Sequence, residues 1–197
     1  MVNTYARSST VIKVAGLVFG RFNPITTAFM PVVDRLAELD ADRYIFISHD
    51  AEGQYMLPRW LRMAHVEAIL KENYPDTAFR VENTADTLSQ ALSIIGSDYD
   101  SLVVLTDSTL CDELKQAIES NNGFIRDGEV EPDYEFSSIE VIPIDCTDLW
   151  NGRHTYESAY ARDAVARDSR ELFRKAIPSC DESLMDDMFD DLKRSRK

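Results

Sequence analysis

Polar residues that could bind an anion gather in one short segment, Gly20 to Thr27, between an apolar run and a helix-type pattern. Arg21 could bind a phosphate, or equally pair with one of the 35 acidic residues of the chain. Thr26 could also contact a phosphate, although a threonine at a helix start is very often an N-cap. The segment is therefore a candidate ligand loop, with a structural alternative for each side chain.

The histidines offer other chemistry. His49 follows a strand-type run, so we expect it at the carboxyl end of a strand, on the side where ligands bind. His65 lies in a helix-type pattern and is expected to be structural, whereas His154 follows an arginine and could touch a base or a phosphate. The three histidines lack metal-ligand spacing and the three cysteines form no CxxC pair, so neither a metal site nor a disulfide framework is predicted.

The candidate loop follows a strand and opens a helix. Val11 to Phe19 (VIKVAGLVF) is apolar and β-branched without a helical period, which predicts a buried strand. Thr27 to Leu39 carries apolar residues at helical spacing, with Pro31 tolerable only in the first turn. The start of this helix would direct backbone N–H groups and the positive end of its dipole at the loop.

Strands and helices alternate along the rest of the chain. Further strands are predicted at 43–48, 79–82, 101–106 and 138–144, and further helices at 58–74, 84–95, 108–120, 156–173 and 182–192. This order predicts an α/β fold, a Rossmann-like doubly wound parallel sheet of about five strands with flanking helices and a C-terminal helical segment. Residues 121–136 carry turn signals and are expected to form a surface excursion. We expect one domain over 1–180, followed by an acidic helix with a basic tip at 181–197.

The segment Phe19 to Arg35, FGRFNPITTAFMPVVDR, resembles the first strand-loop-helix of the HxGH nucleotidyltransferases, in the form of phage-encoded members. Weaker similarity covers most of the chain. These enzymes attack the α-phosphate of an NTP with a phosphorylated acceptor and release pyrophosphate, and Mg²⁺ accompanies the triphosphate. The resemblance implies that Gly20, Phe22, Asn23 and Thr26 belong to a nucleotide-phosphate loop, with Thr26 as a phosphate ligand.

The same resemblance implies that the chain has lost the histidine on which this chemistry depends. The family's glycine and histidine positions are Ala28 and Phe29 here. A phenylalanine neither donates a hydrogen bond nor carries charge, and the loss of one such donor typically costs about 2.7–4 kcal/mol, or roughly 100- to 1000-fold in rate. Ala28 adds a methyl group where the family has bare backbone. Basic residues of the family between the second strand and second helix would be Arg59 and Arg62.

Two later motifs are eroded as well. The family's Gly-Ser-Asp after the fourth strand corresponds to residues 105–107 (LTD), which keep only Asp107. The serine-rich motif that grips the triphosphate corresponds to residues 157–162 (ESAYAR). Arg162 survives there, although an arginine beside an aspartate on an acidic protein usually forms a surface ion pair, and Glu157 places a negative charge where phosphate would sit. A shift of one residue would bring in Ser158 but misplace the arginine.

These departures predict a degenerate nucleotidyltransferase-like protein that is non-catalytic and has an interaction, structural or regulatory role, with at most residual nucleotide binding. Two alternatives stay open. An active adenylyl- or cytidylyltransferase would need His49 or Arg21 to replace the missing histidine, and Mg²⁺ would enter with its NTP. A sensing module would bind a nucleotide without turning it over.

Charge limits the partners of this chain. Its 21 basic and 35 acidic residues give a formal net charge of −14, which repels nucleic-acid phosphates and anionic lipid. No apolar run approaches the roughly 18 residues of a membrane span and no signal peptide is recognised, so a cytoplasmic location is expected, in the host cytoplasm or virion for a phage-encoded protein. The acidic C-terminal helix carries an apolar stripe that is expected to pack on the domain or, alternatively, to bind a protein partner. The stripe consists of Met185, Met188, Phe189 and Leu192.

Overall fold

A five-stranded parallel sheet forms the centre of the protein, in the strand order β3-β2-β1-β4-β5. The structure, a computed structural model, describes residues 12–49, 55–146 and 157–196, with only the backbone of Glu157. The strands are β1 (Val14–Gly20), β2 (Asp42–Ile47), β3 (Arg80–Glu82), β4 (Ser101–Asp107) and β5 (Ser138–Ile144). The predicted Rossmann-like, doubly wound α/β fold is confirmed.

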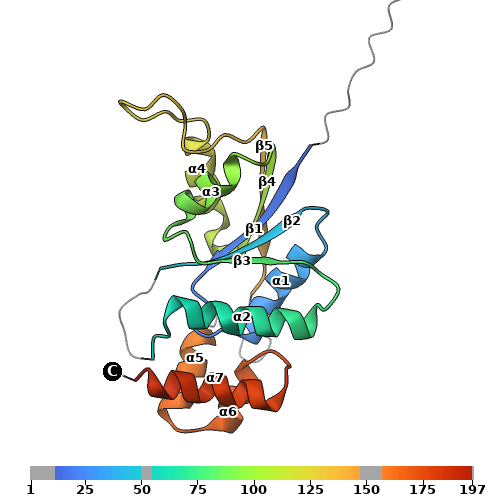
Figure 1. Cartoon of the computed structure of the whole chain (residues 1–197), viewed down its shortest axis with the longest axis vertical. Helices are drawn as coiled ribbons and strands as arrows, with labels where there is room; N and C mark the ends of the chain where they lie inside the picture. The colour runs from blue at the N-terminus through green and yellow to red at the C-terminus, as the bar shows by residue number, and fades with distance from the viewer. Residues whose placement is uncertain (1–11, 50–54, 147–156, 197) are drawn as a thin grey trace, which may run out of the picture.

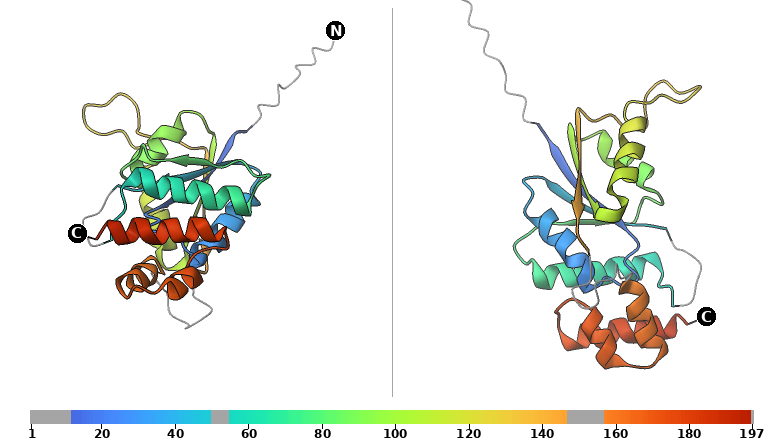
Figure 2. Two further views of the ribbon diagram at one scale, coloured as in Figure 1. Left: turned by 60° about the horizontal axis from the view of Figure 1, so that its bottom comes forward. Right: turned by 180° about the vertical axis from the view of Figure 1, so that it is seen from behind.

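Helices cover both faces of the sheet and add a further layer at one side (Figure 1). One face carries α1 (Met30–Ala37) and α2 (Arg59–Asn73), and the other carries α3 (Leu88–Gly96) and α4 (Cys111–Asn121). The further layer consists of α5 (Glu157–Ala166), α6 (Arg170–Ala176) and α7 (Glu182–Arg194). It packs on the α1–α2 side, so α2 lies between the sheet and α7 (Figure 2).

The central strand supplies two separate cores. Val18 packs in the core that contains α1 and α2, whereas Leu17 packs in the core that contains α3 and α4. Successive side chains of a strand point to opposite faces, so a strand buried on both faces must be apolar at every position. This explains why the run around β1 shows no alternation of polar and apolar residues.

The apolar stripe of the C-terminal helix is a packing surface. Met188, Phe189 and Leu192 are fully buried in the core of the α1–α2 side, and Met185 packs against it partly buried. The stripe therefore packs on the domain, which was one of the two expectations for it. A partner at this helix would have to use its acidic outer face.

Residues 157–173 do not form the single helix that their pattern predicts. The helix α5 ends at Ala166 and α6 begins at Arg170. Asp168 lies between them with a φ of 56°, a left-handed conformation that a helix interior does not tolerate. Ser169 then caps α6, because its hydroxyl accepts a hydrogen bond from the Leu172 amide.

Three predicted helices begin later than expected. Helix α3 begins at Leu88 because Thr87 and Gln90 form a capping box at its start. Helices α1 and α4 are each preceded by a short 3₁₀ turn, η1 (Thr27–Phe29) and η2 (Ser108–Leu110). Within the described ranges, no helix is both long and apolar enough to cross a bilayer.

Candidate functional site

The candidate loop lies where the order of the sheet reverses. The chain leaves β1 toward β2 on one side and leaves β4 toward β5 on the other, and β1 and β4 are neighbours. Residues 21–26 follow the carboxyl end of β1 at this point (Figure 1). Doubly wound sheets bind their ligands at such a switch point, so the fold places the loop as the sequence predicts.

The loop is held in one conformation by its own buried residues. Asn23 is fully buried, and its side chain donates to the Tyr55 carbonyl at 3.0 Å and accepts from the Leu57 amide at 3.0 Å. The Asn23–Pro24 peptide bond is cis, and Phe22 has a φ of 46°. Phe22 and Asn23 therefore shape the loop, and neither presents a polar side chain to solvent.

A buried arginine joins the loop to two other segments. Arg62 of α2 is fully buried and donates from Nη1 to the Arg21 carbonyl at 2.5 Å. It also donates from Nη2 to the Ser48 carbonyl and from Nε to the Leu57 carbonyl, each at 3.1 Å. Arg62 thus fixes the backbone of three segments through their carbonyl groups. The resemblance implied only that Arg62 is a basic residue near the ligand site.

The ring of Phe29 packs against the loop at the family's histidine position. Its centroid lies 4.6 Å from that of Phe22, with the rings at 88°. Phe29 is half-buried and directly precedes α1. Gly20 lies against the Phe22 ring, since a Cβ at this position would come within 2.9 Å of Phe22. The space beside the loop is thus occupied by aromatic carbon.

Helix α5 brings two polar side chains to the loop. Arg162 donates from Nη1 to the Asn23 carbonyl at 2.6 Å, and Ser158 donates to the Pro24 carbonyl at 2.8 Å. Burial lowers the pKa of Arg162, and the charge of Arg21 lowers it further. Ser158 and Arg162 lie one turn apart on the same helix face, so both can reach the loop. The loop is therefore contacted by the arginine of the first alignment of residues 157–162 and by the serine of the shifted one.

Arg21 and Arg162 form a cationic pair on an acidic protein. Arg21 is exposed, and among the described residues its side chain has no acidic partner. Two guanidinium groups that repel each other bind a shared anion favourably, because the anion removes the repulsion. The surface ion pair, one of the two alternatives for Arg21, is not present among the described residues, and anion binding by Arg21 stays a prediction.

His49 belongs to a different cluster at the carboxyl edge. Its Nδ1 lies 2.8 Å from Nη2 of Arg59 and 3.3 Å from Oδ1 of Asp86, and Arg59 also bonds to Asp86. Arg59 donates further to the Asn83 carbonyl at 2.5 Å. These contacts tie the end of β2 to the segment before α3, and they engage His49 there rather than at the loop.

The remaining predicted site residues have local roles. Asp107 caps η2, since its carboxylate accepts from the Thr109 amide at 2.8 Å. Thr26 is buried before η1, and its side chain makes no capping hydrogen bond. His154 and the side chain of Glu157 lie outside the described residues. Within the described ranges, no three His, Cys, Asp or Glu side chains gather as a metal site would require.

The comparisons with known proteins do not assign a family. No family model matches the chain, and no curated protein matches it. The site itself offers two cations, a buried scaffold and a helix start, which suit an anion. At residue 29, where the resemblance leads one to expect a histidine, the site has an aromatic ring.

Proposed function

We propose that this chain is a degenerate nucleotidyltransferase-like protein. It does not transfer nucleotides at enzymatic rates, and it acts in an interaction, structural or regulatory role with residual binding of a nucleotide phosphate. The fold, the placement of the loop at the switch point and the two arginines beside it support the nucleotidyltransferase-like part. The non-catalytic part rests on Phe29.

The contact between Phe29 and Phe22 carries the proposal. A substitution that merely pointed a phenylalanine into open space would leave room for another donor or a water. Here the Phe29 ring packs edge-on against a loop residue at 4.6 Å, so the side chain has become part of the packing of the loop. Neither ring can donate to a phosphoryl oxygen during transfer.

Residual binding is supported by charge. Free nucleotides are repelled at long range by a chain of net charge −14. At short range they would meet Arg21 and Arg162, and charge-assisted hydrogen bonds to phosphate contribute about 1.5–3 kcal/mol each. The balance corresponds to weak binding, with a dissociation constant on the order of 1 mM.

The active alternative needs a replacement for the histidine. His49 is at the carboxyl edge, but Arg59 and Asp86 engage its Nδ1. Arg21 is cationic and exposed, so it can hold a phosphate, but it is poorly suited to exchange a proton at neutral pH. The geometry therefore favours the degenerate protein over the active enzyme.

Pyrophosphate release tests the absence of catalysis. The whole chain is incubated with ATP or CTP, Mg²⁺ and the phosphorylated acceptors used by adenylyl- and cytidylyltransferases. We expect release at the rate of a protein-free control. Turnover near the ordinary enzymatic rate of about 10 per second would contradict the proposal.

Calorimetry with ATP and CTP tests the residual binding. We expect Arg21→Met to weaken binding about tenfold, because one charge-assisted contact is lost. Arg35→Met is the matched control, since Arg35 is an exposed arginine further along α1 that pairs with Glu38. Equal loss in both variants would mean that general charge, and not the loop, attracts the nucleotide. Wild-type binding tighter than about 100 μM would instead indicate a nucleotide sensor.

A further inference from the structure

The segment between α4 and β5, residues 122–136, projects from the body of the protein and is here named the projecting loop (Figure 1). Asn122 closes its base, because its side chain donates to the Phe136 carbonyl at 3.0 Å and accepts from the Phe136 amide at 2.8 Å. The Gly123 amide donates to the Tyr134 carbonyl at 2.9 Å. Both aromatic residues are buried in the core of the α3–α4 side. The base is therefore fixed to the domain.

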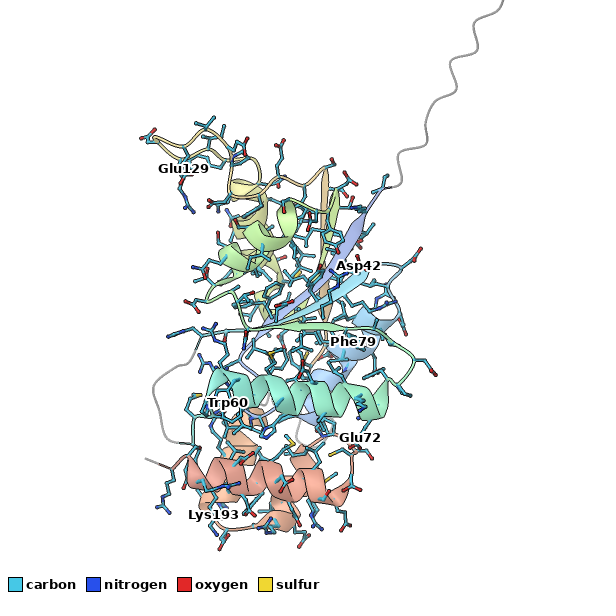
Figure 3. All side chains as sticks on the ribbon, in the orientation of Figure 1. Asp42, Trp60, Glu72, Phe79, Glu129 and Lys193 are labelled. Atoms are coloured by element: carbon cyan, nitrogen blue, oxygen red, sulfur yellow. The ribbon has the colours of Figure 1, made fainter. Side chains whose placement is uncertain are left out.

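The outer part of the projecting loop is held by its own contacts. Arg126 and Asp133 form an ion pair at 2.7 Å across it. The Glu129 amide donates to the Arg126 carbonyl at 3.0 Å, which closes a turn, and Gly128 in this turn has a φ of 91°. Glu129, which is labelled in Figure 3, lies on this projecting part. A loop with a fixed base and an internal ion pair presents a defined surface.

Three apolar side chains on this loop face solvent. Phe124 is 56% exposed, Ile125 is 50% exposed and Val130 is 90% exposed. Single exposed apolar residues are common, but three within seven residues of a fixed projection remain unburied although the domain beside them has a core. Such loops on a rigid scaffold typically carry binding functions.

The charge of the projecting loop is strongly negative. Its only base, Arg126, is already paired with Asp133. The acids are Asp127, Glu129, Glu131, Asp133 and Glu135. Glu129 and Glu131 flank Val130, so acidic groups surround the most exposed apolar residue. A complementary surface would have an apolar pocket within a basic rim.

A polar groove lies between the projecting loop and α3. Its volume is about 280 Å³, which suits one or two side chains of a partner. It is lined by Thr87, Ser89, Gln90, Ser93, Arg126 and Asp133. The side chains of Ser89 and Ser93 thus line the groove together with the ion pair of the loop, and their hydroxyl groups can accept the hydrogen bonds of a basic side chain.

We propose that the projecting loop and the adjacent face of α3 bind a protein partner that surrounds an apolar pocket with basic side chains. Two copies of this chain would bring equal negative charges together, and nucleic acid or anionic lipid would meet the same repulsion. Insertion of Val130 into a bilayer would carry Glu129 and Glu131 toward the lipid. A basic protein would bury the apolar residues and also pair with the acidic residues around them.

This inference specifies the interaction role in the proposed function, and it rests on other residues than the arginine pair. The projecting loop leads into the amino end of β5, whereas the arginine pair lies at the carboxyl end of β1. Nucleotide binding and partner binding can therefore fail separately. Calorimetry with ATP should give the same result for wild-type chain and for variants of the projecting loop.

A displayed library of random peptides tests the surface. The peptides have about 12 residues, which span roughly 18 Å as a helix. The whole chain selects binders, and each binder is measured against Phe124→Ser combined with Val130→Ser. The matched control is Leu110→Ser, an apolar residue of 54% exposure that follows the carboxyl end of β4. All substituted positions are exposed, so thermal melting should confirm that the folds are retained.

We expect enriched peptides that combine Lys or Arg with large apolar residues. Their affinity should fall at least tenfold in the double variant, remain unchanged in Leu110→Ser and decrease with added salt. Peptides that bind the double variant as well as the wild type would overturn the proposal, as would enrichment without basic residues. Val130-dependent binding to phosphatidylcholine vesicles, or a dimer lost in the double variant, would overturn it in favour of a membrane or a second copy.

Discussion

Phe29 exchanges a potential hydrogen-bond donor for a packing contact. Edge-to-face aromatic pairs such as Phe22–Phe29 contribute about 0.5–1.5 kcal/mol beyond the area that they bury. The pair thus contributes to the stability of the loop.

Reversal of the two substitutions should restore part of the ligand site. Phe29→His with Ala28→Gly is expected to raise the affinity for ATP in calorimetry and to lower the free energy of unfolding by about 1–2 kcal/mol, since the ring pair is lost and a glycine enters a helical turn. Phe29→Leu is the control, because it removes the ring pair without adding a donor. If both variants bind ATP like the wild type, another feature closes the loop.

Residue chemistry was partly readable from the sequence. The resemblance places residue 29 at a histidine position, because Gly20, Asn23 and Pro24 match the motif before it; this alignment stays a prediction. The ring contact that Phe29 makes depends on the left-handed backbone conformation of Phe22. No sequence pattern indicated this conformation. Likewise, Arg162 was predicted at the loop, but its bond to the Asn23 carbonyl depends on the docking of α5.

At the scale of elements, α2 lies between two layers and is buried on both sides. Arg62 faces the ends of β1 and β2, and His65 faces α7, and both side chains are buried. Helical periodicity indicates one buried face, so the structural role expected for His65 gave no partner for it, and nothing in the pattern placed Arg62 in the interior. Alternation of strands and helices fixed the sheet, but it could not show that a C-terminal layer covers α2. The chemistry of Arg62 was therefore predicted only as a general basic residue.

Arg62→Lys should destabilise the protein strongly. A lysine ammonium is a point donor and cannot reach three carbonyl groups that a planar guanidinium spans. We expect a loss of about 3 kcal/mol, since buried carbonyl groups are left without donors. Urea denaturation measures this loss.

Arg59→Lys is the comparison for that substitution. Arg59 lies in the same helix but is partly exposed, so its bonds to His49 and Asp86 are screened by solvent and we expect a loss below about 1 kcal/mol. A similar loss in the two variants would show that burial of Arg62 does not determine its contribution.

At the scale of the whole molecule, a buried histidine, His65, makes the attachment of the C-terminal layer sensitive to pH. His65 Nε2 lies 3.0 Å from Asp191 of α7, and its Nδ1 is buried without a hydrogen-bond partner among the described residues. Burial lowers the pKa of His65 below 6.5, although Asp191 and Asp187 act in the opposite direction. Arg194 competes for Asp191 by pairing with it at 2.7 Å.

The pH dependence of stability follows from this shift. Below pH 6.5 the unfolded chain binds the His65 proton more readily than the folded chain does. The contribution of His65 is thus fully present above pH 6.5, falls as the pH decreases, and levels off below the folded pKa. Urea midpoints of wild type and His65→Gln across about pH 5–7.5 check it, because glutamine keeps a donor and does not titrate. We expect the urea midpoint of the wild type to fall relative to that of His65→Gln as the pH decreases. A difference between the two midpoints that does not change with pH would contradict this.

The C-terminal layer also affects how the chain reaches its folded state. Val33 and Leu36 of α1 share their core with Phe189 and Leu192 of α7, so early and late residues complete one packing unit. At a synthesis rate of about 5–20 residues per second, a ribosome needs roughly 8–30 s to proceed from Leu36 to Leu192. During that interval the apolar outer sides of α1 and α2 lack the C-terminal layer that packs on them, and they are exposed to aggregation. Cells that make this protein are therefore expected to depend on a ribosome-associated chaperone for its yield, more than for a domain whose core closes early.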